Sequence, residues 1–468
     1  MTFLITDYGA IGDGTVLATA SIQKAIDAAH AAGGGRVVVP PGRWLSGTLF
    51  LRSRTVFDIQ PGATVVGSPR LTDYVAMTHT DGDRTPWHLF VVHGEEDVTL
   101  CGGGGVDGSG AAYWADAPLP GTWMLHKNNQ RPSPLLDVRE CKRTRVENLR
   151  FRNSPGWMLH FHHTERVWIR GVEIDNPLFG PNTDGVDISG CSDVMISDCL
   201  INAADDAIVA FSSFERACER VTVTNCTLRS NCVAFKAYLF PGHDVRDLVF
   251  SNSVVFETNR AVGLYGCNTG TIENVLVSNV VCDTNCEVTF TRPIHIDAIC
   301  SDKARGTVRN VQVSNMVCRT DGRILLLCQP GAVVENVVLR DVRMHYPVLD
   351  DPRPYGGRGK TGDQGSSWSR EARVAPAAVV VEGVTNLVVD NLMIDWPKGK
   401  RDETWINKPR AGNGTHDMFP PPPEKAPAFQ AVWGRRLKSG SLRVPLAKAS
   451  VDGMAALNIE DSDIAVVG

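Results

Sequence analysis

Three carboxylates lie within residues 182–206, in positions where a strand with a purely structural role would not need an acidic side chain. The stretch carries Asp184 in an Asn-Thr-Asp-Gly motif and ends with the adjacent pair Asp205 and Asp206. Successive side chains of a strand point to opposite faces, so a regular strand would bury one acid of the pair at a cost of several kcal/mol. The pair is therefore expected at a strand end or bend, where both groups stay hydrated.

Three acids in one place suit acid–base chemistry on a sugar linkage. Inverting hydrolysis of a glycosidic bond needs a protonated carboxylic acid and a carboxylate base about 6.5 to 9.5 Å apart, with room for a water molecule. Mutual repulsion among the acids would keep one of them protonated near neutral pH. The alternative interpretation of the same residues is a calcium site or a solvated acidic turn.

The acids belong to a repeated segment that begins near residue 140. In most repeats, apolar residues lie four and two before, and one and three after, a central Asn, Asp or Gly. This pattern predicts two short strands of period two with a bend between them. The central residues, spaced most often by 27 positions, are Asn148, Gly171, Asp198, Asn225, Asn252, Asn279, Asn315, Asp341 and Asn391.

Repeats of this length indicate a solenoid, and strands of this kind indicate the coils of a parallel β-helix. Asp184 and Asp205 are 205 − 184 = 21 residues apart, so they are expected on neighbouring coils. The register also places cysteines in inward columns, such as Cys199 with Cys226. We interpret these cysteines as small buried hydrophobic residues rather than as metal ligands, and we predict no metal and no cofactor.

The rest of the chain is interpreted as a cap and two loops on one domain that spans residues 1–468. In the cap region, residues 1–45, the apolar residues between Ser21 and Ala32 follow one helical face, and a glycine run ends this helix. The helix is predicted to cover the open end of the sheet. Residues 350–376 and 398–427 are predicted to be long loop insertions, and an oligomer would form through these C-terminal loops.

Composition excludes several classes of partner. The formal net charge is −5 and the pI is about 6.2, without a long basic run, so neither nucleic acid nor a membrane is expected as a partner. No apolar run approaches the length of a membrane span, and no secretory signal is visible. An odd number of cysteines, 13, favours reduced thiols. A cytoplasmic location is therefore expected.

The motifs around the acids resemble the polygalacturonase family of glycoside hydrolases, family 28. The resemblance rests on an Asn-Ser-Pro-Gly-Trp motif that ends at Trp157, on Asn-Thr-Asp-Gly-Val-Asp from Asn182, and on the Asp205–Asp206 pair. It implies an all-β fold, a right-handed parallel β-helix, and an inverting mechanism. In that mechanism Asp205 would be the general acid, and Asp184 and Asp206 would hold and deprotonate the water.

The chain departs from the family on the next two coils. Cys232 stands where the family has the histidine of a Gly-His-Gly motif, and Gly263-Leu264-Tyr265 stands where it has Arg-Ile-Lys. The expected substrate is therefore an oligosaccharide other than unsubstituted galacturonan, such as a fragment of branched pectin or a related glycan. The candidate substrate-binding residues are Asn182, Trp157, His160, Lys236, Tyr238, Arg260 and Tyr265.

Two other classes of protein stay open on the sequence. A β-helix polysaccharide lyase would make an unsaturated product and would stop when calcium is chelated, whereas an epimerase would leave chain length unchanged. A non-catalytic carbohydrate-binding β-helix would bind sugar without turnover.

Overall fold

The computed structural model describes residues 1–78, 84–118, 124–127, 130–285, 291–350, 369, 371–372, 375–398, 405–406, 429–444 and 457–467. The chain divides into two compact units. The first comprises Met1–Leu119, Met124–Ala210 and Cys218–Leu228, and the second comprises Pro120–Trp123, Phe211–Ala217 and Arg229–Gly468. One domain over residues 1–468 stays a prediction. Most of the two predicted loop insertions, 350–376 and 398–427, lies outside the described residues.

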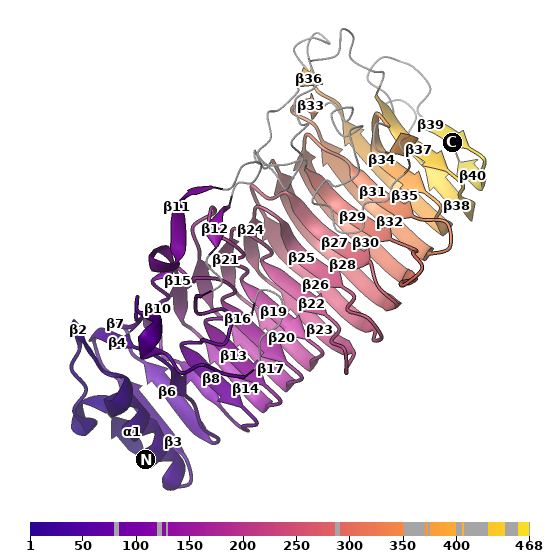
Figure 1. The fold of residues 1–468 in the computed structure, drawn as a ribbon. Coiled ribbons are helices and arrows are strands. Elements are labelled where there is room, and N and C mark those ends of the chain that lie inside the picture. Colours follow the sequence, from indigo (N-terminus) through magenta and orange to yellow (C-terminus); the bar gives the residue numbers. More distant parts are fainter. Residues whose placement is uncertain are drawn as a thin grey trace. The chain divides into compact units, whose positions relative to one another are not determined.

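The first unit is a stack of parallel β-coils (Figure 1). One of its sheets, called the site sheet here, contains β5 (Leu49–Phe50), β8 (Phe90–His93), β13 (Leu136–Arg139), β16 (Leu159–His162), β19 (Val186–Ser189) and β22 (Ile208–Phe211). A second ladder contains β1 (Thr2–Leu4), β3 (Gly35–Val39), β6 (Thr55–Ile59), β9 (Thr99–Cys101), β14 (Lys142–Glu147), β17 (Glu165–Arg170), β20 (Ser192–Ser197) and β23 (Cys218–Thr224). A third contains β2 (Asp13–Leu17), β4 (Gly42–Ser46), β7 (Ala63–Gly67), β10 (Gly105–Asp107), β15 (Arg150–Arg152), β18 (Glu173–Asp175), β21 (Leu200–Ala203) and β24 (Thr227–Ser230). Outside these ladders lie three 3-10 helices and an antiparallel pair: η1 (Ile5–Tyr8), η2 (Leu71–Asp73), η3 (Gly110–Tyr113), β11 (Trp114–Pro118) and β12 (Leu125–Lys127).

The second unit repeats the parallel coil with longer strands. One sheet contains β25 (Val233–Tyr238), β27 (Arg260–Gly266), β29 (Arg292–Ala298), β31 (Ile324–Cys328), β34 (Ala377–Glu382), β37 (Gln430–Arg435) and β39 (Leu457–Glu460). The other contains β26 (Val245–Val255), β28 (Gly270–Thr284), β30 (Gly306–Thr320), β32 (Val333–His345), β35 (Thr385–Asp395), β38 (Lys438–Arg443) and β40 (Asp463–Val467). A short parallel pair joins β33 (Leu349–Asp350) to β36 (Trp405–Ile406).

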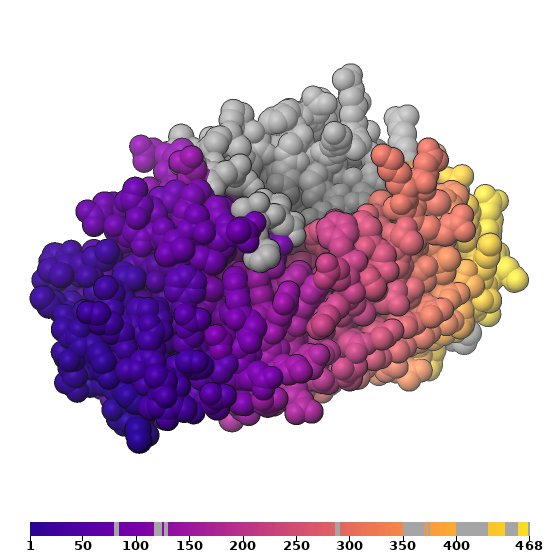
Figure 2. Space-filling model, turned by 60° about the horizontal axis from the view of Figure 1, so that its bottom comes forward, coloured from indigo at the N-terminus to yellow at the C-terminus, as the bar shows by residue number. Residues whose placement is uncertain are grey.

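The predicted capping helix is present as α1 (Thr19–Ala31), which lies in the indigo segment of Figures 1 and 2. Its apolar face is buried and packs against β1, β3, β5 and β6. The helix ends where Gly33 has a φ of +87° and Gly34 a φ of +128°. Glycine adopts such positive φ values more easily than any other residue. No helix among the described residues is long and apolar enough to cross a membrane.

The predicted bends are confirmed at every central residue of the repeat. All of them, from Asn148 to Asn391, have φ between +51° and +62°. Asn, Asp and Gly tolerate this left-handed conformation best among the amino acids. A second bend lies five residues earlier in each coil, from Arg143 to Asn386, also with positive φ. The sequence analysis missed this second bend.

Side chains at both bends form ladders that run from coil to coil. In the second unit Asn279 donates from Nδ2 to Oδ1 of Asn252 at 2.9 Å and accepts from Nδ2 of Asn315 at 2.7 Å. A parallel ladder joins Asn310 to Asn274 at 3.1 Å. The bend of each of these coils is therefore stabilised by side-chain hydrogen bonds to the neighbouring coils as well as by its own residue type.

Replacing Asn279 by Ala is expected to lower the free energy of unfolding by about 1–2 kcal/mol, because alanine strains the left-handed bend and loses both ladder bonds. Asn279→Gly removes the same bonds but tolerates the conformation, so its loss should be smaller. Urea unfolding of the two variants measures the difference. Equal losses would contradict the argument from backbone conformation.

The inward columns of cysteine are confirmed. Cys282 pairs with Cys318 in the register of β28 and β30, and both are buried. The cysteines within the described residues are free thiols. Burial raises the pKa of the Cys141 thiol to about 11, so this side chain is an uncharged hydrophobic residue at neutral pH.

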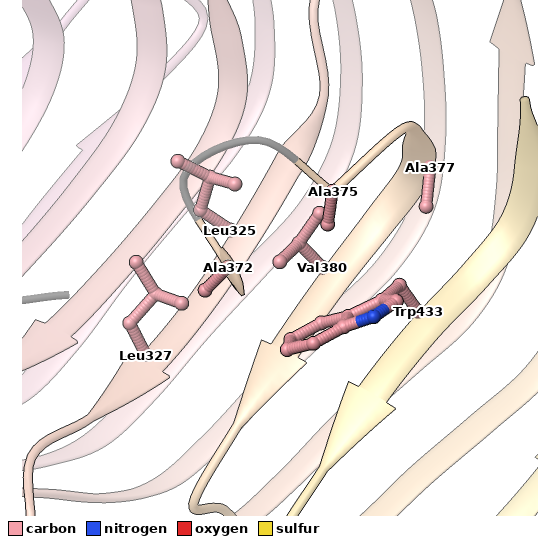
Figure 3. Close-up of a cluster of buried hydrophobic side chains, with 7 residues drawn as sticks. All are labelled: Leu325, Leu327, Ala372, Ala375, Ala377, Val380 and Trp433. Atoms are coloured by element: carbon pink, nitrogen blue, oxygen red, sulfur yellow. The ribbon is translucent and has the colours of Figure 1, made fainter. Parts of the chain in front are cut away.

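The outer face of one sheet in the second unit carries a buried apolar cluster (Figure 3). Leu325, Val380 and Trp433 occupy one column across β31, β34 and β37. Ala372 and Ala375, from a segment that returns over the sheet, cover this column. The cluster therefore closes a sheet face that strand alternation alone would leave in water. It contains Leu325, Leu327, Ala372, Ala375, Ala377, Val380 and Trp433.

Candidate active site

The three predicted acids lie on two neighbouring coils of the first unit. Asp184 comes two residues before β19, and Asp206 comes two residues before β22. The backbone N–H of Gly185 donates to the carbonyl of Asp206 at 2.9 Å, which places Asp184 beside Asp206 in the parallel register. The prediction that the acids occupy neighbouring coils is confirmed.

Gly185 lets the two coils approach at this point. A Cβ at residue 185 would come 2.4 Å from the carbonyl oxygen of Ala207, which is far inside van der Waals contact. Adjacent parallel strands lie about 4.8 Å apart. The glycine in the Asn-Thr-Asp-Gly motif therefore has a packing role, because it brings the carboxylate of Asp184 within one strand spacing of the next coil.

Asn182 orients the remaining acid. It has a φ of +49° and donates from Nδ2 to Oδ2 of Asp205 at 3.2 Å. Asp205 is half-buried, whereas Asp184 is 5% exposed and Asp206 is 3% exposed. Asp205 is therefore the acid with the most surface open to a ligand. The expectation that both acids of the Asp205–Asp206 pair stay hydrated is wrong for Asp206, which is buried.

Buried hydrogen bonds hold the loop before β19. The backbone N–H of Ser154 donates to Oδ1 of Asn176 at 3.0 Å, and Nδ2 of Asn176 donates to the carbonyl of Thr183 at 3.3 Å. Thr183 in turn donates from Oγ1 to the carbonyl of Gly180 at 3.2 Å. These bonds fix the backbone on either side of Asn182, so the loop that carries Asp184 is held in place.

Trp157 lies on the coil before the acids. The backbone N–H of Met158 donates to the carbonyl of Asp184 at 3.0 Å, which places Trp157 next to Asp184 in the register. Trp157 is half-buried, and the centroid of its ring lies 5.5 Å from that of His160. Trp157 therefore lies beside the acidic stretch, and its role in binding substrate stays a prediction.

A buried carboxylate that the sequence analysis did not identify lies on the coil before that of Trp157. Asp137 on β13 is 1% exposed and pairs with His160 in the strand register. It accepts hydrogen bonds from Nδ1 of His160 at 3.0 Å, Nε2 of His93 at 2.9 Å and Nε of Arg139 at 2.8 Å. Nε2 of His88 lies 3.8 Å from the same carboxylate. We call these five residues the Asp137 cluster.

The charges of the Asp137 cluster follow from burial. Burial raises the pKa of the Asp137 carboxyl, but the electrostatic interaction with His88 and the hydrogen bonds from His160 and His93 outweigh it and hold that pKa well below its ordinary value. Burial also lowers the pKa of His160 to about 4, so its ring is neutral at neutral pH. Because Nδ1 of His160 then carries the proton that it donates to Asp137, Nε2 is the unprotonated nitrogen.

His160 is therefore a supporting residue in this structure. Its side chain is 1% exposed, so the surface that a sugar could touch here belongs to Trp157 rather than to His160. The predicted role of His160 in binding substrate is corrected to one of supporting Trp157, because burial and the bond to Asp137 occupy its ring.

The other predicted binding residues lie in the second unit. Lys236 and Tyr238 are on β25, with Nζ of Lys236 5.4 Å from the ring centroid of Tyr238. Arg260 begins β27 and places Nη1 3.8 Å from Sγ of Cys232. Tyr265 is 2% exposed and contacts His295, whereas Tyr238 keeps part of its surface open. The predicted sugar contact of Tyr265 is corrected, because its ring is covered by protein.

Ligand oxygens of Asp205 and Asp206, which both belong to the first unit, lie within 4.8 Å of each other, close enough to share a ligand. The absence of a metal or cofactor nevertheless stays a prediction.

The solved structures most similar in shape include an exopolygalacturonase from Thermotoga maritima, with a TM-score of 0.66, 20% identity, and coverage of 84% of this chain and 92% of that one. An endo-xylogalacturonan hydrolase from Aspergillus tubingensis matches with a TM-score of 0.57 and 16% identity, over 88% of this chain and 100% of that one. These likenesses concern the fold, and they agree with the predicted right-handed parallel β-helix with an N-terminal capping helix.

Sequence comparison gives the family. A probable polygalacturonase from Vitis vinifera is 26% identical over 223 residues, which cover 45% of this chain and 44% of that protein. The chain thus spans less than half the length of the curated relatives it matches. The family model described as glycosyl hydrolases family 28 matches residues 75–351, which is more than half of the chain. The protein therefore belongs to glycosyl hydrolases family 28.

Proposed function

We propose that this protein is an inverting glycoside hydrolase that acts on oligosaccharides. The observation that carries the proposal is the placement of Asp184 and Asp206 at equivalent positions on neighbouring coils, with Asp205 held by Asn182 beside them. Family membership supports hydrolysis of a glycosidic bond as the reaction class.

In the proposed mechanism Asp205 donates a proton to the glycosidic oxygen as the bond to the anomeric carbon breaks. Asp184 and Asp206 hold a water molecule on the opposite face of the sugar and accept its proton as the oxygen attacks that carbon. The configuration at the anomeric carbon inverts in a single displacement. Asp205 suits the role of acid because it is the most exposed of the three.

We infer a substrate other than unsubstituted galacturonan, such as a fragment of branched pectin or a related glycan. Cys232 and the Gly263-Leu264-Tyr265 segment replace the histidine and cationic motifs expected from the family resemblance. Losing a charge-assisted contact to a carboxylate typically costs about 2–5 kcal/mol in a partly buried site. The likeness in fold to a xylogalacturonan hydrolase is compatible with a substituted substrate. Tyr238, which is half-buried, is the aromatic residue that we propose for recognition of such a sugar.

Incubation with defined oligosaccharides, followed by proton NMR of the first product, tests the proposal. The expected result is a newly formed reducing end of inverted configuration from a neutral or substituted oligosaccharide, and turnover of trigalacturonate that is lower by about tenfold or more. Efficient cleavage of trigalacturonate would contradict the substrate. In that case Lys236 or Arg260 would have to bind the carboxylate.

The same incubation separates the rival classes. A lyase would produce ultraviolet absorbance from an unsaturated sugar and would stop with chelator. An epimerase would change the sugar without shortening the chain, and a binding protein would leave the spectrum unchanged. A product that retains configuration would contradict the inverting mechanism while leaving hydrolysis intact.

A further inference from the structure

A cavity of about 290 Å³ lies in the second unit, at the ends of β31, β34 and β37. These are C-terminal coils, coloured from salmon to yellow in Figure 1. The polar side chains that line the cavity include Asp297, Gln329, Glu382, Arg435 and Arg436. A second hollow of about 480 Å³ shares Gln329 and Arg436 with the first. The two hollows together have the volume of a small-ligand site.

The cavity is bounded by the apolar cluster of Figure 3. Leu327 belongs to both, so the covered sheet face forms one wall of the cavity. Glu382 and Arg435 are paired in the register of β34 and β37, beside this wall. A ligand would therefore meet an apolar surface on one side and charged groups on the other, as in most small-molecule sites.

Arg436 is fixed at the junction of the two hollows. Its backbone has a φ of +55°, and Nη2 lies 3.3 Å from Oε1 of the buried Glu382 and 3.4 Å from the carbonyl oxygen of Cys328. Gly383 is needed for this approach, because a Cβ there would come 2.6 Å from the Cys328 oxygen. The side chain of Arg436 is still 34% exposed, so part of its guanidinium faces the cavity.

Arg435 carries a side-chain donor that no acceptor among the described residues satisfies. Among the described residues, its Nε is buried and has no hydrogen-bond partner. Its Nη1 lies 3.5 Å from Glu371, which is 58% exposed, so this is a surface pair of little strength. A buried N–H without an acceptor is unfavourable, and a rotation of the Arg435 side chain that turns this N–H toward an anionic ligand in the cavity would satisfy it.

We propose that this cavity binds the carboxylate of an acidic sugar, at a site built from residues of the second unit alone. Two neighbouring guanidinium groups match the planar oxygens of a carboxylate. Gln329, which is half-buried and lines the cavity, would bond a sugar hydroxyl group. The carboxylates of Asp297 and Glu382 would disfavour a doubly charged phosphate more than a singly charged uronate. The choice of a sugar as the bearer of the carboxylate rests on the proposed function.

Hydrogen–deuterium exchange of the full chain with sodium galacturonate, galactose or inorganic phosphate tests this site. Galacturonate is expected to slow exchange in residues 429–444, and galactose and phosphate are not. Arg435→Gln and Arg436→Gln should each raise the apparent Kd for galacturonate by about tenfold or more, because each removes a charge-assisted bond. Arg443→Gln is the matched control, since Arg443 is 65% exposed, pairs with Asp390 and does not line the cavity.

Three outcomes would overturn the proposal: no protection by galacturonate, protection that both cavity variants retain, and tighter binding of phosphate than of galacturonate. If Arg436→Gln unfolds because Glu382 loses its partner, Arg435→Gln and Arg436→Lys decide the question. Lysine keeps the charge but not the two-pronged geometry, so it should weaken binding less than glutamine would. Protection that persists while no oligosaccharide is cleaved would remove the proposed function and leave this site standing.

Discussion

Asp205→Asn is expected to lower kcat by about 10²–10⁴-fold with little change in KM, because asparagine has no proton to give to the departing oxygen. The substitution keeps the shape of the side chain, and Asn182 can still donate to the remaining oxygen. Steady-state hydrolysis of the best oligosaccharide substrate measures the effect. An aryl glycoside of the same sugar should lose much less, because its leaving group needs no protonation.

Asp198→Asn is the matched control for this experiment. Asp198 lies at a bend of the same coil with φ of +58°, where asparagine is the residue found at Asn225 and Asn252 in later coils. Its side chain is 45% exposed and pairs with Arg170, so the same chemical change there should leave kcat unaltered. Near-normal activity of Asp205→Asn on the oligosaccharide would refute the assignment of Asp205 as the acid.

The regular part of the fold could be predicted because the residue types at single positions determine where the bends lie. Asn, Asp and Gly at Asn148, Gly171 and Asp198 mark a left-handed bend, and the structure has one at each. The second bend is occupied by Arg143 and Arg220 in the first unit, and arginine has no such preference, but Asn274 and Asn310 in the second unit carried the same signal and were overlooked. In the first unit a coil-to-coil ion pair between Arg220 and Asp193, at 2.7 Å, lies at this bend.

The acids could be identified because two adjacent carboxylates conflict with strand alternation. Asp137 shows no such conflict, since Leu136-Asp137-Val138-Arg139 is the pattern of an ordinary half-exposed strand. The repeat nevertheless contained a signal that Asp137 and His160 lie side by side on neighbouring coils. Asp137 and His160 are 160 − 137 = 23 residues apart, which equals the 171 − 148 = 23 between two bends of the same coils.

Burial of the Asp137 cluster could not be predicted in the same way. It depends on segments distant in the chain, such as that of Arg84, whose charge contributes to lowering the pKa of His160. The apolar cluster at Leu325 was missed for a similar reason, because the residues that cover it, Ala372 and Ala375, return from a separate segment. Strand periodicity gives the direction of a side chain but not what lies above it.

Asp137→Asn is expected to lower the free energy of unfolding by about 3–5 kcal/mol, which is the usual effect of removing one partner from a buried ion pair. Arg139 would keep a buried charge without its carboxylate. The NH2 group of the new amide would face the N–H of His93, or its neutral oxygen would accept from the N–H of His160 more weakly than the carboxylate does. Urea unfolding at pH 7 measures the loss. Asp198→Asn is again the control, because that exposed pair should contribute no more than about 1 kcal/mol.

The pH dependence of this loss identifies its cause. A carboxyl whose folded pKa lies below its unfolded value of about 3.9 stabilises the folded state above that value, and the stabilisation disappears as the pH falls through the folded pKa. The difference between wild type and Asp137→Asn should therefore persist from pH 8 to about pH 4 and shrink only below it. Histidine protonation acts in another window: because the folded pKa of His160 is about 4, both proteins should lose stability between pH 6.5 and about 4. A difference that vanished between pH 8 and pH 5, or one below about 1 kcal/mol at pH 7, would show that the carboxylate of Asp137 is not the charged centre that holds Arg139, His93 and His160.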